Sequence, residues 1–329
     1  MKTVVDLQQI EQTSQMALVR HGAAGWIAEQ VARAVRKAEA TGNVICGLYY
    51  LESYCVQLTS GRVQGTVEPV VQHVKASAVE VDAGFGFAQP AFARALPMAL
   101  AAARETGTCS LAVRHAHTCT SLGYFTEQIA EAGLIGIGFT NASAVVSPPG
   151  GNAAVLGTNP MAMAVPAKDG GVAFQFDQST SAVALGKITM AGAAGENIPL
   201  GWAVDADGQP TTDPNAALKG SLVSVGGYKG WGLGLMVEML AAGMTGSANS
   251  LDVKGLKAAD GPPHDLGQFY LLLDPTVFAG DGFWQRLTRV EDAVAAQPPA
   301  RLPGSKRQLP GEVAIDTALW RKVQALAGV

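Results

Sequence analysis

Two short apolar runs on either side of a helix-like segment narrow the possible folds of this chain more than any other feature. The runs are Cys109–Val113 and Leu134–Thr140, and the helix-like segment between them is Leu122–Ala132. A strand, a helix and a second strand in this order are typical of an α/β layer. The sequence therefore predicts an α/β lobe in the middle of the chain.

Helical patterns are found on both sides of this unit. Apolar residues at helical spacing predict one helix over Leu18–Ala40, with a stop at Thr41-Gly42-Asn43. Further helices are expected over Leu48–Leu58, Pro90–Glu105, Tyr228–Ala242 and Asp316–Leu326, and strands are expected between Val67 and Val81. We expect the last helix to pack against the first ones.

The charge balance and the apolar segments argue against two classes of partner. The chain has 23 Lys+Arg and 27 Asp+Glu residues, without a basic run that could neutralise a phosphate backbone, so nucleic acid is not expected. The longest apolar stretches fall short of the roughly 20 residues that span a bilayer, so no membrane segment is expected. Met1–Gln15 lacks the apolar core of a signal peptide, which predicts a cytoplasmic protein.

The cysteines do not indicate a disulfide framework or a metal site. Cys46, Cys55, Cys109 and Cys119 show neither CxxC pairing nor metal-ligand spacing. We expect reduced thiols that act as small buried apolar residues.

The usual dinucleotide-binding fingerprint is absent. The nearest candidates are Gly84-Phe85-Gly86 and Gly230-Trp231-Gly232-Leu233-Gly234. Both lack a preceding apolar strand and a third glycine in register, so a Rossmann fold is not predicted. Helix packing is the simpler explanation for the glycines of the second segment.

Two histidines follow the first apolar run, in Arg114-His115-Ala116-His117. Side chains at a strand end are where α/β proteins commonly place their sites, and a histidine there can exchange a proton near neutral pH. A surface position or a hydrogen-bonded core position is the alternative for each. No carboxylate or cysteine is spaced to complete a metal site with them, so no metal is expected.

Glycine-rich and polar loops supply further candidates. Ser147–Gly151 and Gly157-Thr158-Asn159-Pro160 offer turns and free backbone N–H groups that can hold a carboxylate or a pyrophosphate, although ordinary turns have the same composition. Asp177–Ser181 can bind ribose hydroxyls or cap a helix. Lys229, just before an apolar helix, can meet an anion or remain solvated.

An ordered series of short strings resembles the malate/L-lactate dehydrogenase family, also called L-sulfolactate dehydrogenase-like. The strings are Gly133–Gly136, Pro149–Gly151, Leu156–Pro160, Thr180-Ser181 with Gly186–Ile188, Gly201–Asp205 with Thr211–Pro214, Gly226–Gly230 and Arg301–Gly304. Each is weak alone, but the series covers nearly the whole chain in the family's order.

The resemblance implies an α/β, non-Rossmann fold of two lobes. One is a helical lobe of residues 1–68 with 290–329, built from both chain ends, and the other is a cofactor-binding α/β lobe with a mixed sheet over residues 69–289. It also implies a homodimer and a nicotinamide cofactor, NADPH or NADH, held between the lobes. We expect NADPH to be preferred, as is typical of a biosynthetic reduction.

The resemblance also assigns residues. The positions that correspond to cofactor contacts are His117, Thr118, Cys119, Thr120, Ser121, Asp177, Gln178, Ser179, Lys229, Gly304, Ser305, Lys306 and Arg307. Thr158 corresponds to a substrate-contacting position. His117 matches the first of two paired histidines beside the nicotinamide, and Thr118 stands at the second.

Four positions depart from the family pattern. Ile45-Cys46-Gly47 stands where a Ser-His-Gly run supplies the proton donor, and Tyr50 stands where an arginine grips the substrate carboxylate. Lys187 replaces an acidic residue of the imine reductases. A tyrosine donates one neutral hydrogen bond where an arginine offers a charged bidentate pair, so carboxylate binding through Tyr50 is expected to be weaker.

These departures leave three interpretations of the chemistry. Cys46 donates the proton, His117 does so, or the chain has lost redox activity and is a ligand binder or an enzyme of altered reaction. Phe176-Asp177-Gln178 and Gly226–Gly230 look most like the imine reductase branch, which reduces Δ1-pyrroline-2-carboxylate or Δ1-piperideine-2-carboxylate to L-proline or L-pipecolate. A malate- or lactate-type 2-hydroxyacid dehydrogenase is the second enzymatic interpretation.

Overall fold

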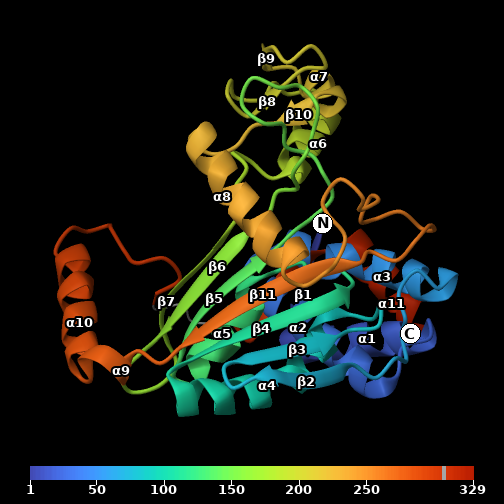
Figure 1. The fold of residues 1–329 in the computed structure, drawn as a ribbon. Helices are drawn as coiled ribbons and strands as arrows, with labels where there is room; N and C mark the ends of the chain where they lie inside the picture. Colours follow the sequence, from blue (N-terminus) through green and yellow to red (C-terminus); the bar gives the residue numbers. More distant parts are fainter. Residues whose placement is uncertain (306–308) are drawn as a thin grey trace.

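The computed structural model describes residues 1–305 and 309–329. A seven-stranded mixed sheet forms its centre, with a cluster of helices beside the sheet and a small lobe above it (Figure 1). The strands of the sheet are β2 (Val70–Lys75), β3 (Ala78–Asp82), β4 (Thr108–Ala116), β11 (Leu266–Leu273), β5 (Ile135–Thr140), β6 (Met161–Pro166) and β7 (Val172–Gln178), in that spatial order.

The predicted strand–helix–strand unit is present as β4, α5 (Gly123–Glu131) and β5. Its two strands are not neighbours, because β11 lies between them and pairs antiparallel with both. β3 and β4 pair in parallel, so the sheet is mixed, as expected.

Two helices cover one face of the sheet. α4 (Ala88–Thr106) packs on β3 and β4, and α5 packs on β5 and β6. The core between them contains alternate residues of the strands, such as Val81, Leu111 and Val113, against Phe92 and Phe125 of the helices. Period-two alternation in the strands and helical spacing in α4 and α5 place these side chains in one layer.

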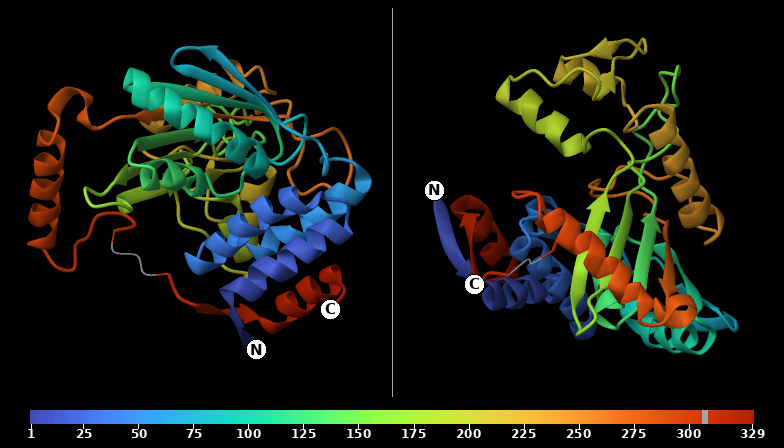
Figure 2. Two further views of the ribbon diagram at one scale, coloured as in Figure 1. Left: turned by 90° about the horizontal axis from the view of Figure 1, so that it is seen from below. Right: turned by 90° about the vertical axis from the view of Figure 1, so that its left-hand side faces the viewer.

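Both chain ends build the helical cluster, as expected (Figure 2). It contains α1 (Leu7–Arg20), α2 (Gly25–Ala40), α3 (Leu48–Ser60) and α11 (Thr317–Ala327), and a two-stranded sheet of β1 (Lys2–Asp6) and β12 (Glu312–Asp316) ties the two ends together. α1 packs on α11, and the turn η1 (Val44–Cys46) precedes α3.

The prediction of a single helix over Leu18–Ala40 is wrong. α1 ends at Arg20, the chain turns at Gly22 with φ of +110°, and α2 begins at Gly25. α1 begins at Leu7, because the Asp6 carboxylate accepts hydrogen bonds from the backbone N–H groups of Gln8 and Gln9. The turn lets both helices place their apolar faces in the same core.

The glycine-rich stretch Gly192–Gly227 contains most of the small lobe. This lobe comprises α6 (Leu185–Ala194), β8 (Ala203–Val204), β9 (Pro210–Thr211), α7 (Pro214–Lys219) and β10 (Ser221–Leu222). α8 (Tyr228–Glu238) then returns toward the sheet and continues through a π-helical turn, η2 (Met239–Gly243), as expected for one helix over Tyr228–Ala242.

A short arm projects from the far edge of the sheet. It consists of α9 (Thr276–Ala279) and α10 (Gly282–Ala295), which stand away from the helical cluster (Figure 2). No residue of α10 is buried. Within the described part of the chain, no helix is long and apolar enough to cross a membrane.

Candidate active site

Three of the predicted cofactor residues line one cleft. Ser121, Asp177 and Gly304 come from the loop after β4, the end of β7 and the C-terminal segment, and they meet around a cavity of about 440 Å³. Residues of α2 and of the turn after it, including Lys37 and Asn43, form the opposite wall. The volume is in the range typical of small-molecule sites.

Asp177 organises the floor of this cleft. Its carboxylate accepts hydrogen bonds from the backbone N–H of Gly123 (2.8 Å) and from the Ser121 hydroxyl (3.4 Å). The side chain faces the cleft, yet the protein around it raises its pKa by desolvation, and the Gly123 hydrogen bond acts in the opposite direction. This contact with the first residue of α5 corresponds to the helix-capping role considered for this segment. In the part of the chain that the structure describes, the other carboxylate oxygen accepts no hydrogen bond.

The backbone at Gly304 lies close against Gln175. Gly304 has φ of +63°, and a Cβ atom there would lie 2.8 Å from Cγ of Gln175 and 2.9 Å from its carbonyl oxygen, so a side chain is excluded. Among residues 1–305 and 309–329, the buried Gln175 Oε1 atom has no hydrogen-bond partner. An amide oxygen can accept a hydrogen bond from a ribose hydroxyl. Lys306 and Arg307 lie outside the described residues.

One face of α3 leads from Cys46 toward the sheet. Tyr50, Tyr54 and Gln57 recur at helical spacing after Cys46, and the rings of Tyr50 and Tyr54 lie 5.8 Å apart. Burial raises the pKa of Cys46 to about 12, with nearby Asp177 adding to the shift. Burial likewise raises the pKa of Tyr50 to about 12, with Cys46 as the next cause. Both side chains therefore keep their protons at neutral pH and can donate hydrogen bonds.

His117 is enclosed rather than exposed to the cleft. Its side chain is 2% exposed and contacts the rings of Tyr54, Phe87 and His264. Burial is the main cause that lowers the pKa of His117 well below its ordinary value, followed by His264 and Arg62, so the ring is neutral.

The hydrogen bonds of Gln57 define the tautomer of His117. The Gln57 amide nitrogen donates to the carbonyl oxygens of Leu256 (2.9 Å) and Ala258 (2.8 Å). Gln57 Oε1 must therefore accept, and His117 Nε2, at 2.5 Å, carries the proton. Nδ1 of His117 is buried and has no hydrogen-bond partner among the described residues.

Glu238 positions Thr158 through Asn159. The Asn159 amide donates to Glu238 Oε2 (2.9 Å) and to the Gly234 carbonyl (3.0 Å), and both residues are buried. Glu238 also accepts from the backbone N–H of Ser250 at 2.7 Å. Thr158 is half-buried, and its carbonyl accepts from the backbone N–H of Thr180.

The remaining predicted cofactor residues differ in exposure. Thr118 and Cys119 are buried, and burial raises the pKa of Cys119. Thr120, Ser179 and Ser305 are half-buried, whereas Gln178 and Lys229 are exposed. All four cysteines are free, and all but Cys46 are buried.

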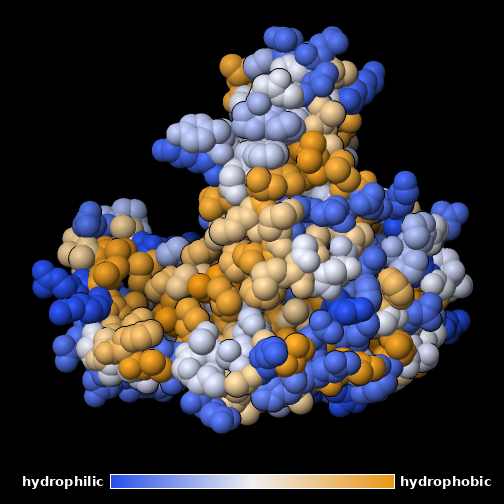
Figure 3. Space-filling model, in the orientation of Figure 1, coloured by the Kyte–Doolittle hydropathy of each residue, from blue (hydrophilic) through white to orange (hydrophobic). Residues whose placement is uncertain are grey.

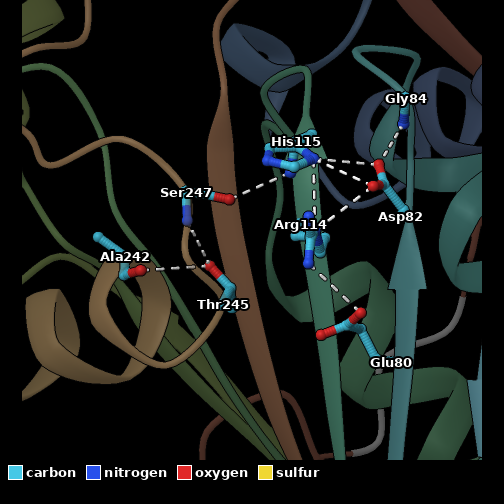
Figure 4. Close-up of polar contacts among 8 residues, drawn as sticks. All are labelled: Glu80, Asp82, Gly84, Arg114, His115, Ala242, Thr245 and Ser247. Carbon is cyan, nitrogen blue, oxygen red and sulfur yellow. Dashed lines mark hydrogen bonds and ion pairs between the residues drawn. The ribbon is translucent and has the colours of Figure 1, made fainter.

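His115 belongs to a different cluster. Its Nδ1 lies 3.2 Å from both carboxylate oxygens of Asp82, while Arg114 pairs with Asp82 and with Glu80 (Figure 4). The backbone N–H of His115 donates to the Ser247 hydroxyl. This network fixes the ends of β3 and β4, from which His117 continues inward. Among residues 1–305 and 309–329, no three His, Cys, Asp or Glu side chains gather as a metal site would require.

Gln57 and His264 were not singled out by the sequence. The spacing Tyr50, Tyr54, Gln57 on one helix face was a usable signal for Gln57. His264 lies in an irregular segment and gave no pattern.

The chain matches known proteins over nearly its whole length. Residues 5–325 match the family model described as malate/L-lactate dehydrogenase. The (2R)-3-sulfolactate dehydrogenase (NADP(+)) of Chromohalobacter salexigens is 38% identical over 307 residues, 93% of this chain and 91% of that protein. The Δ1-pyrroline-2-carboxylate/Δ1-piperideine-2-carboxylate reductase of Pseudomonas putida is 36% identical over 328 residues, 99% of this chain and 95% of that protein.

A solved structure matches equally well. The Δ1-piperideine-2-carboxylate reductase from Pseudomonas syringae superposes with a TM-score of 0.92 at 34% identity, covering 98% of this chain and 99% of that one. The superposition confirms the expected fold, a mixed-sheet lobe with a helical lobe built from both chain ends.

Proposed function

The chain belongs to the malate/L-lactate dehydrogenase family, and on that premise we propose that it reduces a small cyclic 2-imino acid with NADPH or NADH. The substrate is Δ1-pyrroline-2-carboxylate or Δ1-piperideine-2-carboxylate, and the product is L-proline or L-pipecolate. Relatives with this activity in their names are 36% identical to the chain. A relative of similar identity, 38%, is named for an NADP-dependent sulfolactate dehydrogenase, which supports the 2-hydroxyacid dehydrogenase alternative.

The cofactor is proposed to lie in the cleft between α2 and β7. Ser121, the available oxygen of Asp177 and the Gly304 backbone are suited to ribose and phosphate groups. Lys37 at the rim is a cation, already paired with Glu127 at 2.7 Å. When bound, the nicotinamide supplies the hydride. The loop residues Thr118–Thr120, Gln178, Ser179, Lys229 and Ser305 complete the proposed cofactor contacts.

The protonation states of the residues around Cys46 are the reason for proposing an imine rather than a ketone as the substrate. The Cys46 thiol and the Tyr50 phenol hold their protons with a pKa of about 12, and His117 is neutral. None is a strong acid at neutral pH. A protonated imine needs only hydride at its carbon to become an amine, whereas a ketone also needs a proton on oxygen. The residues therefore favour the substrate that already carries its proton.

Thr158 is proposed to contact the substrate, because its loop is held rigidly by Asn159 and Glu238. Cys46 and Tyr50 are proposed to donate hydrogen bonds from the α3 side. His117 is proposed to contribute as a neutral ring that helps to position Gln57 and Tyr54, and not by gaining or losing a proton.

A homodimer is proposed from the uncovered face of the sheet. Ile137, Met161 and Leu271 lie on the face opposite α4 and α5, only partly covered by the packing of α8 and η2. Hydrophobic atoms gather on this side between α8 and α10 (Figure 3). Exposed apolar patches of this kind mark protein interfaces, and a second copy is the occupant that the family implies.

A substrate panel tests the function. The purified protein is mixed with NADPH or NADH and with Δ1-pyrroline-2-carboxylate, pyruvate or oxaloacetate, and cofactor oxidation is followed by absorbance. Preferential oxidation with the cyclic imine is expected. Preference for the oxo acids supports the dehydrogenase alternative. Enhanced fluorescence of bound NADPH without turnover of any substrate supports a ligand-binding protein and contradicts the proposal.

A further inference from the structure

A lysine from a distant loop lies over the tyrosines at the start of α3. The ammonium of Lys257 is 3.5 Å from the ring centroid of Tyr49 and 4.8 Å from that of Tyr50. Attraction between an ammonium and an aromatic face holds the charge in place and leaves N–H groups free for a further partner. A cation therefore stands at the helix turn that follows Cys46.

Two buried side chains fix the loop that carries Lys257. They are Gln57 of α3 and Arg62, which follows this helix. Gln57 donates to the carbonyl oxygens on both sides of Lys257, those of Leu256 and Ala258. Arg62, which is 2% exposed, donates to the carbonyl oxygens of Gly255 (2.9 Å), Ala258 (2.7 Å) and Pro262 (2.9 Å). Because these hydrogen bonds hold the backbone on each side of Lys257, the Cα atom of Lys257 has a fixed position relative to α3.

Lys257 is a cation that remains available to a ligand in this region. Over the residues that the structure describes, it forms no ion pair with a carboxylate. Arg62 is unsuitable for a ligand, since loop carbonyls enclose its guanidinium. Tyr50 is neutral and offers one hydroxyl.

We propose that Lys257 binds the carboxylate of the substrate, with the Tyr50 hydroxyl as the second donor. The proposal rests on the proposed function, because both candidate substrate classes, 2-imino and 2-oxo acids, carry a carboxylate beside the reacting carbon. Lys257 and Tyr50 together supply the charge and the hydrogen bonds at the end of the substrate next to Cys46. Substrates without a carboxylate lack this contact, so the loop sets the specificity.

Steady-state kinetics of full-length variants test the assignment. Lys257→Gln is expected to raise KM for Δ1-pyrroline-2-carboxylate about ten- to a hundredfold, because a charge-assisted hydrogen bond is lost. Lys257→Arg is expected to restore most of the affinity, and the dissociation constant of NADPH should not change. Lys254→Gln, an exposed lysine of the same loop, is the matched control and should leave KM within twofold. An unchanged KM in Lys257→Gln overturns the assignment and leaves the proposed function intact.

A second measurement does not depend on turnover. Acetylation of lysines by a mild acylating reagent is followed by mass spectrometry in the presence of NADP and either L-proline, pyruvate or prolinamide. The carboxylates are expected to protect Lys257 but not Lys254, and prolinamide, which lacks the carboxylate, should protect neither. Equal labelling of Lys257 under all conditions overturns the assignment. Protection by the carboxylates in a protein that reduces no 2-imino or 2-oxo acid supports the assignment and refutes the proposed function.

Discussion

The imidazole rings of His117 and His264 stack in the protein interior, with centroids 3.9 Å apart and planes inclined by 15°. Burial lowers the pKa of both, in the case of His264 to about 3. Below pH about 6.5 the unfolded chain takes up protons that the folded protein does not bind. Stability is therefore fully present above that pH and is lost as the pH falls, by up to about 1.4 kcal/mol per pH unit for each ring.

Replacing His264 measures how much this ring contributes to the pH dependence of the unfolding free energy. In urea unfolding between pH 7.5 and 4.5, His264→Gln is expected to lower the slope of unfolding free energy against pH by up to about 1.4 kcal/mol per unit in the part of this range below pH about 6.5. His73→Gln, at an exposed position of β2, serves as the control. A slope that is the same in wild type and His264→Gln would show that His264 titrates normally in the fold.

Cys46→Ala separates the proposed imine chemistry from ketone chemistry. The thiol, with a pKa of about 12, is a proton source that a ketone needs and a protonated imine does not. We expect kcat with Δ1-pyrroline-2-carboxylate to fall less than about fivefold, and kcat with pyruvate to fall about a hundredfold or more, as for loss of a general acid.

His117→Ala provides the comparison for this experiment. Activity that survives Cys46→Ala and disappears in His117→Ala with both substrates would favour the histidine as the acid. Equal losses with the imine and the oxo acid in Cys46→Ala would refute the distinction drawn here. Circular dichroism of each variant checks that the fold is retained, because His117 is enclosed by Tyr54, Phe87 and His264.

Asp177→Asn tests the floor of the proposed cofactor cleft. The amide can rotate its oxygen toward Gly123 N–H, so α5 keeps its contact, while the charged acceptor for ribose hydroxyls is lost. NADPH affinity, measured by fluorescence titration, is expected to drop about tenfold or more. Asp169→Asn, on the exposed turn before β7, should bind NADPH as the wild type does. Wild-type affinity in Asp177→Asn would place the cofactor elsewhere.

Glu238→Gln tests how the loop that contains Thr158 and Asn159 is held in place. The buried carboxylate accepts from the Asn159 amide and from Ser250, and a glutamine would oppose one of these donors with its own N–H₂ group. We expect a loss of about 2–3 kcal/mol in unfolding free energy and a higher KM with little change in NADPH affinity. Glu105→Gln, exposed at the end of α4, is the control. Unchanged stability and KM would mean that the network does not position Thr158.

Local sequence patterns located the helices and strands around the site along the chain, but they did not predict the order of the strands in the sheet. Helical spacing and apolar runs located β4, α5, β5 and α3, because these residues bury side chains at the periods that the patterns report. The insertion of β11 between β4 and β5 was not predictable. It depends on pairing between Leu111 and Tyr270, which no local signal links.

The residues of the site likewise include some that the sequence identified and some that it did not. Ser121, Asp177 and Gly304 were assigned by resemblance and meet in one cleft. Lys257 was missed, because its position over Tyr50 is produced by Gln57 binding carbonyls 199 and 201 residues further along the chain. Sequence order contains no information about such a contact until the fold is formed.

The uncovered sheet face leads to a prediction about assembly. Ile137 and Met163 are paired neighbours on β5 and β6, and each is half-buried in the single chain. If a second copy covers them, a charge at either position must be desolvated in the interface without a partner. Sedimentation velocity should find the wild type as a dimer and Met163→Lys shifted toward monomer, by at least a hundredfold in dissociation constant. Val70→Lys, an equally simple charge addition at an exposed position of β2, should remain dimeric. A monomeric wild type at micromolar concentration, or a Met163→Lys protein as dimeric as the control, would require the apolar face to have a different partner.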